Sequence, residues 1–307
     1  MSDYQVGFIG IGNMGWPMAK NLLKAGGNIL KAGHKLAVLD LDKPRVAKFV
    51  QEEANAVAAD SAAALAKASN VIITMLPTGP IVRDVMQGLL AEGALNPGTV
   101  VIDMSSSEPV GSKQLSDTLA KAGVALVDSP VSGGVPGAQA GTLTLMIGGD
   151  DPAAIERAWP VLQTMGAKLF RTGASGSGDT MKALNNFIAA ANFRAVSEAL
   201  AMGIKFGLDP NLIIDILNVS TGRSFTSEGA FKTQVLSGKY AAGFALGLLT
   251  KDVKIASDLA GDLGVMAPMC SVVYNAFANA REGLGYSADF TSAHKHWTRD
   301  IADRAKS

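Results

Sequence analysis

Short apolar runs alternate with longer helical segments through the first half of the chain, and this alternation restricts the possible folds strongly. The runs are typical of buried strands and cover residues 6–10, 35–40, 71–76, 100–104, 125–128, 142–147 and 168–171. Between several of them lie Ala-, Leu- and Lys-rich segments with helical spacing, such as 61–68 and 112–122. Strands that alternate with helices form a mostly parallel sheet covered on both faces. We therefore expect an α/β fold with a doubly wound sheet.

The pattern changes near residue 173. The Gly- and Ser-rich segment 173–179 has the character of a hinge and a helix cap, and the helices predicted after it cover about 180–206, 210–219, 246–263, 269–282 and 290–305. A length of 307 residues fits two domains. We expect an α/β domain over 1–174 and an all-α domain over 175–307.

Charge and cysteine content exclude several classes of protein. Lys+Arg and Asp+Glu both number 27, so a net charge of zero gives no electrostatic reason to bind nucleic acid or an anionic membrane. Unbroken apolar runs such as 71–76 fall short of the roughly 18 residues of a membrane span. Cys270 is the single cysteine, and three histidines argue against a metal site. We expect a cytoplasmic protein without a signal peptide or bound metal.

A glycine fingerprint follows the first predicted strand and opens a helix. In Gly10-Ile11-Gly12-Asn13-Met14-Gly15, the first glycine allows a tight turn, the second a close approach to a pyrophosphate, and the third close packing of helix on strand. The phosphates would bind at the N–H groups of the helix N-terminus. The alternative is a tight turn that binds no ligand. We predict a dinucleotide site at Gly10, Gly12, Asn13, Met14 and Gly15.

Asp40 ends the second predicted strand. A carboxylate at this point accepts hydrogen bonds from the adenosine ribose and repels a 2′-phosphate, which favours NAD over NADP. Arg45 keeps NADP use open, and Asp40 and Asp42 could alternatively be turn residues. Asp40 follows Gly15 by 25 positions, which is longer than the usual interval.

A repeated hexapeptide accounts for that extra length. Residues 21–26 (NLLKAG) return as 28–33 (NILKAG), seven positions later, which is nearly two helical turns. If this is a duplication and not a coincidence, the first helix is either lengthened or broken at Gly26-Gly27. Two adjacent glycines cost a helix about 2 kcal/mol relative to alanine.

Four ordered segments resemble the β-hydroxyacid dehydrogenases, which include 3-hydroxyisobutyrate dehydrogenases and tartronate semialdehyde reductases. They are 7–21 (GFIGIGNMGWPMAKN), 128–134 (DSPVSGG), 176–186 (GSGDTMKALNN) and Lys251-Asp252. The resemblance spans essentially the whole chain. It implies an N-terminal Rossmann-type domain, a long interdomain helix, and a helical C-terminal domain that builds a homodimer or homotetramer.

Lys182 is the predicted catalytic residue. Asp179 is a suitable N-cap, which would place Lys182 at the third helical position. The positive end of the helix there lowers a lysine pKa, so that the amine can take the substrate's hydroxyl proton or return it. Asn186 shares the same face at i+4. The resemblance implies that Lys182 is catalytic and that Asn186 holds the substrate, whereas the alternative for Lys182 is a solvated surface lysine.

Residues 132–134 follow the fifth predicted strand on its carboxyl side, where open α/β sheets bind ligands. The backbone N–H groups of Ser132, Gly133 and Gly134, with the serine hydroxyl, could form a nest for a substrate carboxylate. A hairpin turn is the alternative. The resemblance favours the carboxylate role.

The resemblance implies further contacts by position. Those to the cofactor are Leu76, Pro77, Ser106 and Lys251, and those around the substrate are Phe244 and Asp252. Without the resemblance, Lys251 and Asp252 would be an ordinary exposed pair. Arg223 could either contact a second acidic group or brace the site.

Taken together, these features predict an NAD-preferring oxidoreductase that moves a hydride between nicotinamide and a short, carboxylate-bearing 3-hydroxy acid, giving the semialdehyde. 3-Hydroxyisobutyrate is the first choice, and tartronate semialdehyde and threonate-type sugar acids are the alternatives. An imine reductase on the same scaffold and a non-catalytic dinucleotide-binding protein are the rival functions. Both usually lack the lysine, so Lys182 argues against them.

Overall fold

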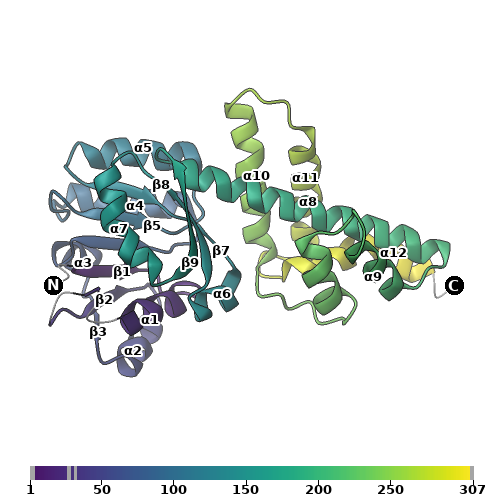
Figure 1. The fold of residues 1–307 in the computed structure, drawn as a ribbon, viewed down its shortest axis with the longest axis horizontal. Coiled ribbons are helices and arrows are strands. Elements are labelled where there is room, and N and C mark those ends of the chain that lie inside the picture. The colour runs from purple at the N-terminus through teal and green to yellow at the C-terminus, as the bar shows by residue number, and fades with distance from the viewer. Residues whose placement is uncertain (1–3, 26–28, 31–32, 305–307) are drawn as a thin grey trace. The chain divides into compact units, whose positions relative to one another are not determined.

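The computed structural model describes residues 4–25, 29–30 and 33–304, with side chains as far as residue 298. The chain folds into two compact units, Met1–Lys182 and Ala183–Ser307 (Figure 1). The division falls inside the longest described helix, α8 (Ser177–Phe206).

A nine-stranded sheet forms the centre of the first unit. Its first six strands are all parallel and lie in the order β3-β2-β1-β4-β5-β6, with bounds Ala56–Ala58, Leu36–Leu39, Val6–Ile9, Val71–Thr74, Val100–Asp103 and Ala125–Asp128. Beyond β6 the sheet continues with β8 (Leu143–Gly148), which pairs antiparallel with β6 and β7 (Val131–Ser132) and parallel with β9 (Gly166–Gly173). The predicted, mostly parallel sheet is confirmed, and β3 and β7 were not predicted.

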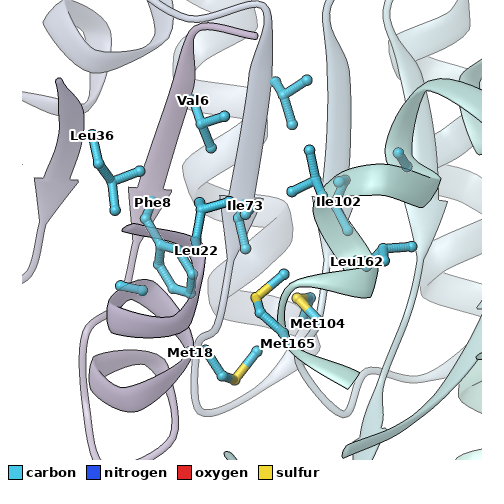
Figure 2. Packing of buried hydrophobic residues seen from close by; sticks show 14 of the residues in the cluster. Val6, Phe8, Met18, Leu22, Leu36, Ile73, Ile102, Met104, Leu162 and Met165 are labelled. Atoms are coloured by element: carbon cyan, nitrogen blue, oxygen red, sulfur yellow. The ribbon is translucent and has the colours of Figure 1, made fainter. Parts of the chain in front are cut away.

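Alternating side chains of the strands bury two separate cores, one on each face of the sheet. Val6 and Phe8 of β1 point into the first core, and Ile9 points into the second. Figure 2 shows Phe8 packed beside Met18 and Leu22 of one covering helix. The helices over the first core are α1 (Gly15–Ala25), α2 (Lys43–Glu52) and α7 (Pro152–Gln163). Those over the second core are α3 (Ala62–Lys67), α4 (Gly79–Ala91) and α5 (Pro109–Ala120).

Helices build the second unit, as predicted. Phe193 of α8 packs its ring 4.8 Å from that of Phe231, and both are wholly buried in one apolar core. The elements after α8 are α9 (Pro210–Asn218), a π-helix (Ser227–Val235), α10 (Leu246–Asp262), α11 (Pro268–Leu284), a 3₁₀ turn (Phe290–Ser292) and α12 (Ala293–Arg304). The π-helix, a rare conformation, was not predicted.

The connection between α1 and β2 contains the repeated hexapeptide. Helix α1 ends at Ala25, and Leu30 forms a parallel bridge with Tyr4 instead of continuing a helix. The first helix is therefore not lengthened through the second copy. The alternative break at Gly26-Gly27 lies outside the described residues.

Among the described helices, α8 has the length and composition of a membrane span, with a mean hydropathy of 1.3 over 18 residues. This property was missed because charged residues interrupt its apolar runs. Core helices of water-soluble proteins have the same length and composition, so α8 does not by itself indicate a membrane protein.

Candidate active site

The glycine fingerprint lies at the carboxyl end of β1. The neighbours of β1 are β2 on one side and β4 on the other, so the loop sits where the strand order reverses, which is where open α/β sheets bind ligands. Gly10 has φ 95°, and a Cβ there would lie 2.3 Å from the carbonyl oxygen of Met75. A Cβ on Gly15 would lie 2.0 Å from the carbonyl oxygen of Gly10. Both positions therefore require glycine for the fold itself.

Gly12 has a different reason to be glycine. A Cβ built there would have no atom nearer than 3.9 Å, and that atom is Nη1 of Arg45. The space in front of the Gly12 backbone is therefore open, as the close approach of a pyrophosphate requires. The residues present therefore fit a bound dinucleotide.

Asp40 lies against the glycine loop. Its Oδ2 accepts a hydrogen bond from the Ile11 N–H at 2.9 Å, and its Oδ1 accepts one from the Asp42 N–H at 2.9 Å. Arg45, held by Asp42 at 3.4 Å, flanks the same loop. A carboxylate and a guanidinium thus both lie beside the position expected for the adenosine ribose.

The ends of β4 and β5 carry the other predicted cofactor residues of the first unit. The Leu76 N–H donates to the hydroxyl of Ser105 at 2.9 Å, which joins the loop of Leu76 and Pro77 to the loop of Ser106. Both loops leave the same sheet edge as the glycine loop, because parallel strands end together. In the glycine loop, Asn13 is exposed and Met14 is half-buried.

The start of α8 differs from the prediction. The helix begins at Ser177, so Asp179 lies inside its first turn and is not the N-cap. Lys182 is therefore the sixth helical residue and not the third, and the helix dipole acts on it more weakly because that effect fades beyond the first turn. The helix end therefore gives little reason to expect a lowered pKa for Lys182.

Asp128, at the end of β6, performs the capping. Its wholly buried carboxylate accepts the N–H groups of Gly176 at 2.8 Å, Gly178 at 2.8 Å and Asp179 at 3.2 Å. Burial raises the pKa of Asp128, and these donors oppose that rise. The segment predicted as a hinge is thus tied to the sheet.

Asp179 itself turns toward the loop after β5. Its Oδ1 accepts the Ser107 N–H at 3.2 Å, and the Ser112 hydroxyl lies 2.6 Å from its Oδ2. Burial raises the pKa of Asp179 well above its usual value, and the negative charges of Asp128 and Asp103 raise it further. Sequence reasoning missed this group of three buried carboxyls, although Asp128 ends one predicted strand and Asp103 is the last residue but one of another.

Residues 132–134 do not form a hairpin turn, so that alternative is wrong. Ser132 ends β7, Gly133 has φ 132°, and Gly134 (φ 60°) begins the short helix α6 (Gly134–Ala140). The segment begins four residues after Asp128.

In the second unit, Asn186, Asp252 and Lys251 form one network. Nδ2 of Asn186 donates to Oδ2 of Asp252 at 2.5 Å, and Oδ1 of Asp252 lies 2.9 Å from Nζ of Lys251. Asn185 donates to Oδ1 of Asn186 at 3.0 Å, which fixes the orientation of the amide. The side chains of Lys251 and Asp252 are 18% and 4% exposed, so the alternative of an ordinary exposed pair is wrong. Phe244 is half-buried.

A surface cavity of about 380 Å³ opens on the first unit near Leu126 and Asp150, and no predicted site residue lines it. Its lining includes the start of β6, away from the end that carries Asp128. Within the described residues, no group of three or more His, Cys, Asp or Glu side chains is arranged to hold a metal ion.

Two protein families match the chain in succession. Residues 5–173 match the NAD binding domain of 6-phosphogluconate dehydrogenase. Residues 176–297 match a family described as the NAD-binding domain of NADP-dependent 3-hydroxyisobutyrate dehydrogenase.

Individual relatives match over nearly their whole length. The 2-(hydroxymethyl)glutarate dehydrogenase of Eubacterium barkeri is 37% identical, with 95% of this chain and 94% of the relative covered. The 3-hydroxyisobutyrate dehydrogenase of Pseudomonas aeruginosa is 36% identical, with 92% and 96% covered. Among solved structures, the 3-hydroxyisobutyrate dehydrogenase of Mycobacterium tuberculosis with L-serine has a TM-score of 0.84 and 31% identity, with 97% and 99% covered.

Proposed function

The chain belongs to the β-hydroxyacid dehydrogenase family, and we propose that this NAD(P)-dependent oxidoreductase of hydroxy acids acts on a short 3-hydroxy acid, with 3-hydroxyisobutyrate as first choice. The observation that carries the proposal is the placement of Lys182. It lies in the second turn of α8, whose start is held by Asp128, and Asp128 also leads into residues 132–134. Asp128 thus holds the start of the helix that carries Lys182, the predicted proton carrier. It also lies four residues before 132–134, the predicted carboxylate-binding segment.

Each group then has a chemical task. Bound NAD(P) supplies the acceptor or donor of the hydride. During oxidation Nζ of Lys182 takes the hydroxyl proton while the carbinol carbon loses its hydride, and during reduction it returns that proton to the carbonyl oxygen. The N–H groups of Ser132, Gly133 and Gly134 bind the carboxylate. Asn186 has one N–H engaged by Asp252 and offers its second to the substrate.

The names of the relatives support a specific substrate outline. 3-Hydroxyisobutyrate, 2-(hydroxymethyl)glutarate and L-serine all carry a primary hydroxyl on the carbon next to the one that bears the carboxylate. They differ in the substituent on that middle carbon. We therefore propose a 2-substituted 3-hydroxypropanoate, of which glycerate, the reduction product of tartronate semialdehyde, is another example. Threonate lies outside this outline and ranks last.

The deciding experiment measures NAD⁺ reduction at alkaline pH with 3-hydroxyisobutyrate, glycerate, L-serine, 2-(hydroxymethyl)glutarate and threonate. One of the first four should give the highest kcat/KM. 3-Hydroxybutyrate, whose hydroxyl is secondary, is the matched control and should react poorly. Turnover of threonate or 3-hydroxybutyrate above all of the others would contradict the proposed outline.

We further propose that the enzyme prefers NAD but accepts NADP through Arg45. Arg45→Ala should lower kcat/KM for NADP about tenfold, the value of one charge-assisted hydrogen bond, and leave that for NAD within twofold. Lys48→Ala is the control, because Lys48 is a mostly exposed cation on the same helix. An equal loss with both cofactors would show that Arg45 does not read the 2′-phosphate.

Exposed apolar side chains in the second unit support the proposal of a homodimer or homotetramer. Phe206, Val219, Phe225 and Met266 are each more than four-fifths exposed. Burying such a side chain against another copy contributes roughly 1.5–3 kcal/mol. Such a gain would favour self-association through this unit.

A further inference from the structure

We propose that Asp103 is a positioning residue for the nicotinamide half of the cofactor, because its buried carboxyl group holds the loop after β4 and the loop after β5 in one arrangement. The inference rests on the cofactor contacts predicted for these two loops. It assigns a function to a buried polar side chain that sequence reasoning did not single out.

Asp103 lies where the core of the sheet would accept an apolar side chain. It is the last residue of β5, it is 2% exposed, and it pairs in register with Thr74, the last residue of β4. Burying a carboxyl group costs free energy unless hydrogen bonds compensate for the lost water. The partners of its two oxygen atoms should therefore explain why a carboxyl group is there.

Three donors from the ends of both strands converge on this carboxyl group. Oδ1 accepts the Thr74 hydroxyl at 2.8 Å and the Ser105 N–H at 3.0 Å, and Oδ2 accepts the Ser107 hydroxyl at 2.9 Å. The Ser105 hydroxyl in turn accepts the Leu76 N–H at 2.9 Å. Asp103 thus connects the end of β4 with the loop after β5, and Ser105 connects that loop with the loop after β4.

These hydrogen bonds determine where Ser106 lies. Its two neighbours, Ser105 and Ser107, are 1% and 3% exposed and both bind Asp103, whereas Ser106 is half-buried. A residue that is held on both sides keeps a fixed place at the edge of the sheet. A cofactor contact requires this, since a displacement of about 1 Å is enough to lose a productive geometry.

The order of the strands indicates which part of the cofactor these loops meet. Asp40 follows β2 and the glycine loop follows β1, so the adenosine and the pyrophosphate would bind on that side of the sheet edge. The next strands in the sheet are β4 and β5, and each lies about 4.8 Å further along. A dinucleotide that extends from Asp40 across the glycine loop therefore brings its nicotinamide half to the loops that Asp103 holds.

The first test compares the binding of NADH with that of ADP-ribose, which has the same adenosine, pyrophosphate and second ribose but no nicotinamide. Asp103→Ala should weaken NADH binding about tenfold, the value of one lost hydrogen bond, and leave ADP-ribose binding within twofold. Asp103→Asn keeps an acceptor for Thr74 and Ser105 and offers an N–H to the Ser107 hydroxyl, so its NADH binding should stay within about threefold of the wild type. Calorimetric titration measures all of these affinities.

Two results would overturn the proposal. An equal loss of affinity for both ligands in Asp103→Ala would show that Asp103 supports only the fold. Asp103→Asn with NADH binding as weak as that of Asp103→Ala would show that the hydrogen bonds are not what matters. Failure of the predicted cofactor site is distinguishable, because Gly12→Ala would then bind both ligands as tightly as the wild type. None of these measurements uses a hydroxy acid, so they do not depend on the proposed substrate.

A matched pair of valine substitutions tests the inference with Asp103 in place. Thr74→Val removes one donor to Asp103 and keeps the shape of the side chain. Thr99→Val is the control, because Thr99 directly precedes β5 at its other end, is 1% exposed, and has a hydroxyl without a hydrogen-bond partner in the described part of the chain. Thr74→Val should weaken NADH binding about threefold and spare ADP-ribose, whereas Thr99→Val should bind both like the wild type. Equal NADH affinities of the two variants would contradict the proposed role of Asp103.

Discussion

Lys182→Ala should lower kcat for hydroxy-acid oxidation by about 10²–10⁴, the usual contribution of a positioned general acid or base. The proton of the substrate hydroxyl would then have no acceptor on α8 as the hydride leaves. NAD binding should stay within twofold, because the proposed role of Lys182 is proton transfer and the predicted cofactor contacts are at the glycine loop and Asp40. Steady-state kinetics and calorimetric titration with NAD would measure both quantities.

Two controls sharpen that result. Lys205→Ala changes a lysine in the last turn of the same helix and should leave kcat unchanged. Added ethylamine should restore part of the activity of Lys182→Ala, because a free amine can replace the missing proton acceptor. Retention of a tenth or more of the wild-type kcat without added amine would rule out Lys182 as the general base.

The second large effect is expected at the glycine loop, where substitutions of Gly12 and Gly15 should have different consequences. Gly12→Ala should weaken NAD binding about a hundredfold. The methyl group occupies the space of the pyrophosphate and costs two charge-assisted hydrogen bonds of about 1.5 kcal/mol each. Its free energy of unfolding should hardly change, because the nearest atom is 3.9 Å from the new Cβ.

Gly15→Ala should instead destabilise the first unit by about 1–3 kcal/mol, since the new Cβ would lie 2.0 Å from a backbone oxygen. Urea unfolding with and without NAD distinguishes the two variants. If Gly12→Ala bound NAD normally, the cofactor could not approach this backbone, and the predicted cofactor site would be wrong.

The strands could be predicted because of how deeply they are buried. A parallel strand covered on both faces consists almost entirely of apolar residues, and residues 71–74 and 100–103 show this plainly. β3 has three residues and an exposed Val57, so it lacks that signal. The π-helix has a mixed sequence that no periodicity rule separates from an ordinary helix.

The environment of Lys182 could not be predicted in the same way. Local capping rules assigned the start of α8 to Asp179, the nearest suitable residue. The true cap, Asp128, lies 48 residues before Gly176, the first of its partners, and meets it only because β6 ends beside the start of the helix. A carboxylate that caps a distant helix leaves no local pattern in the sequence.

The connection between α1 and β2 indicates where the length of this protein is free to change. It enters β2 at Leu36, the end of that strand opposite Asp40, and Asp40 meets the Ile11 N–H at 2.9 Å although 25 positions separate it from Gly15. An insertion there would change the edge of the sheet at which β2 begins. The cofactor and the catalytic residues are predicted at the opposite edge, where the parallel strands end. We therefore expect a peptide tag inserted into this connection to leave NAD binding unchanged, which calorimetric titration with NAD would measure.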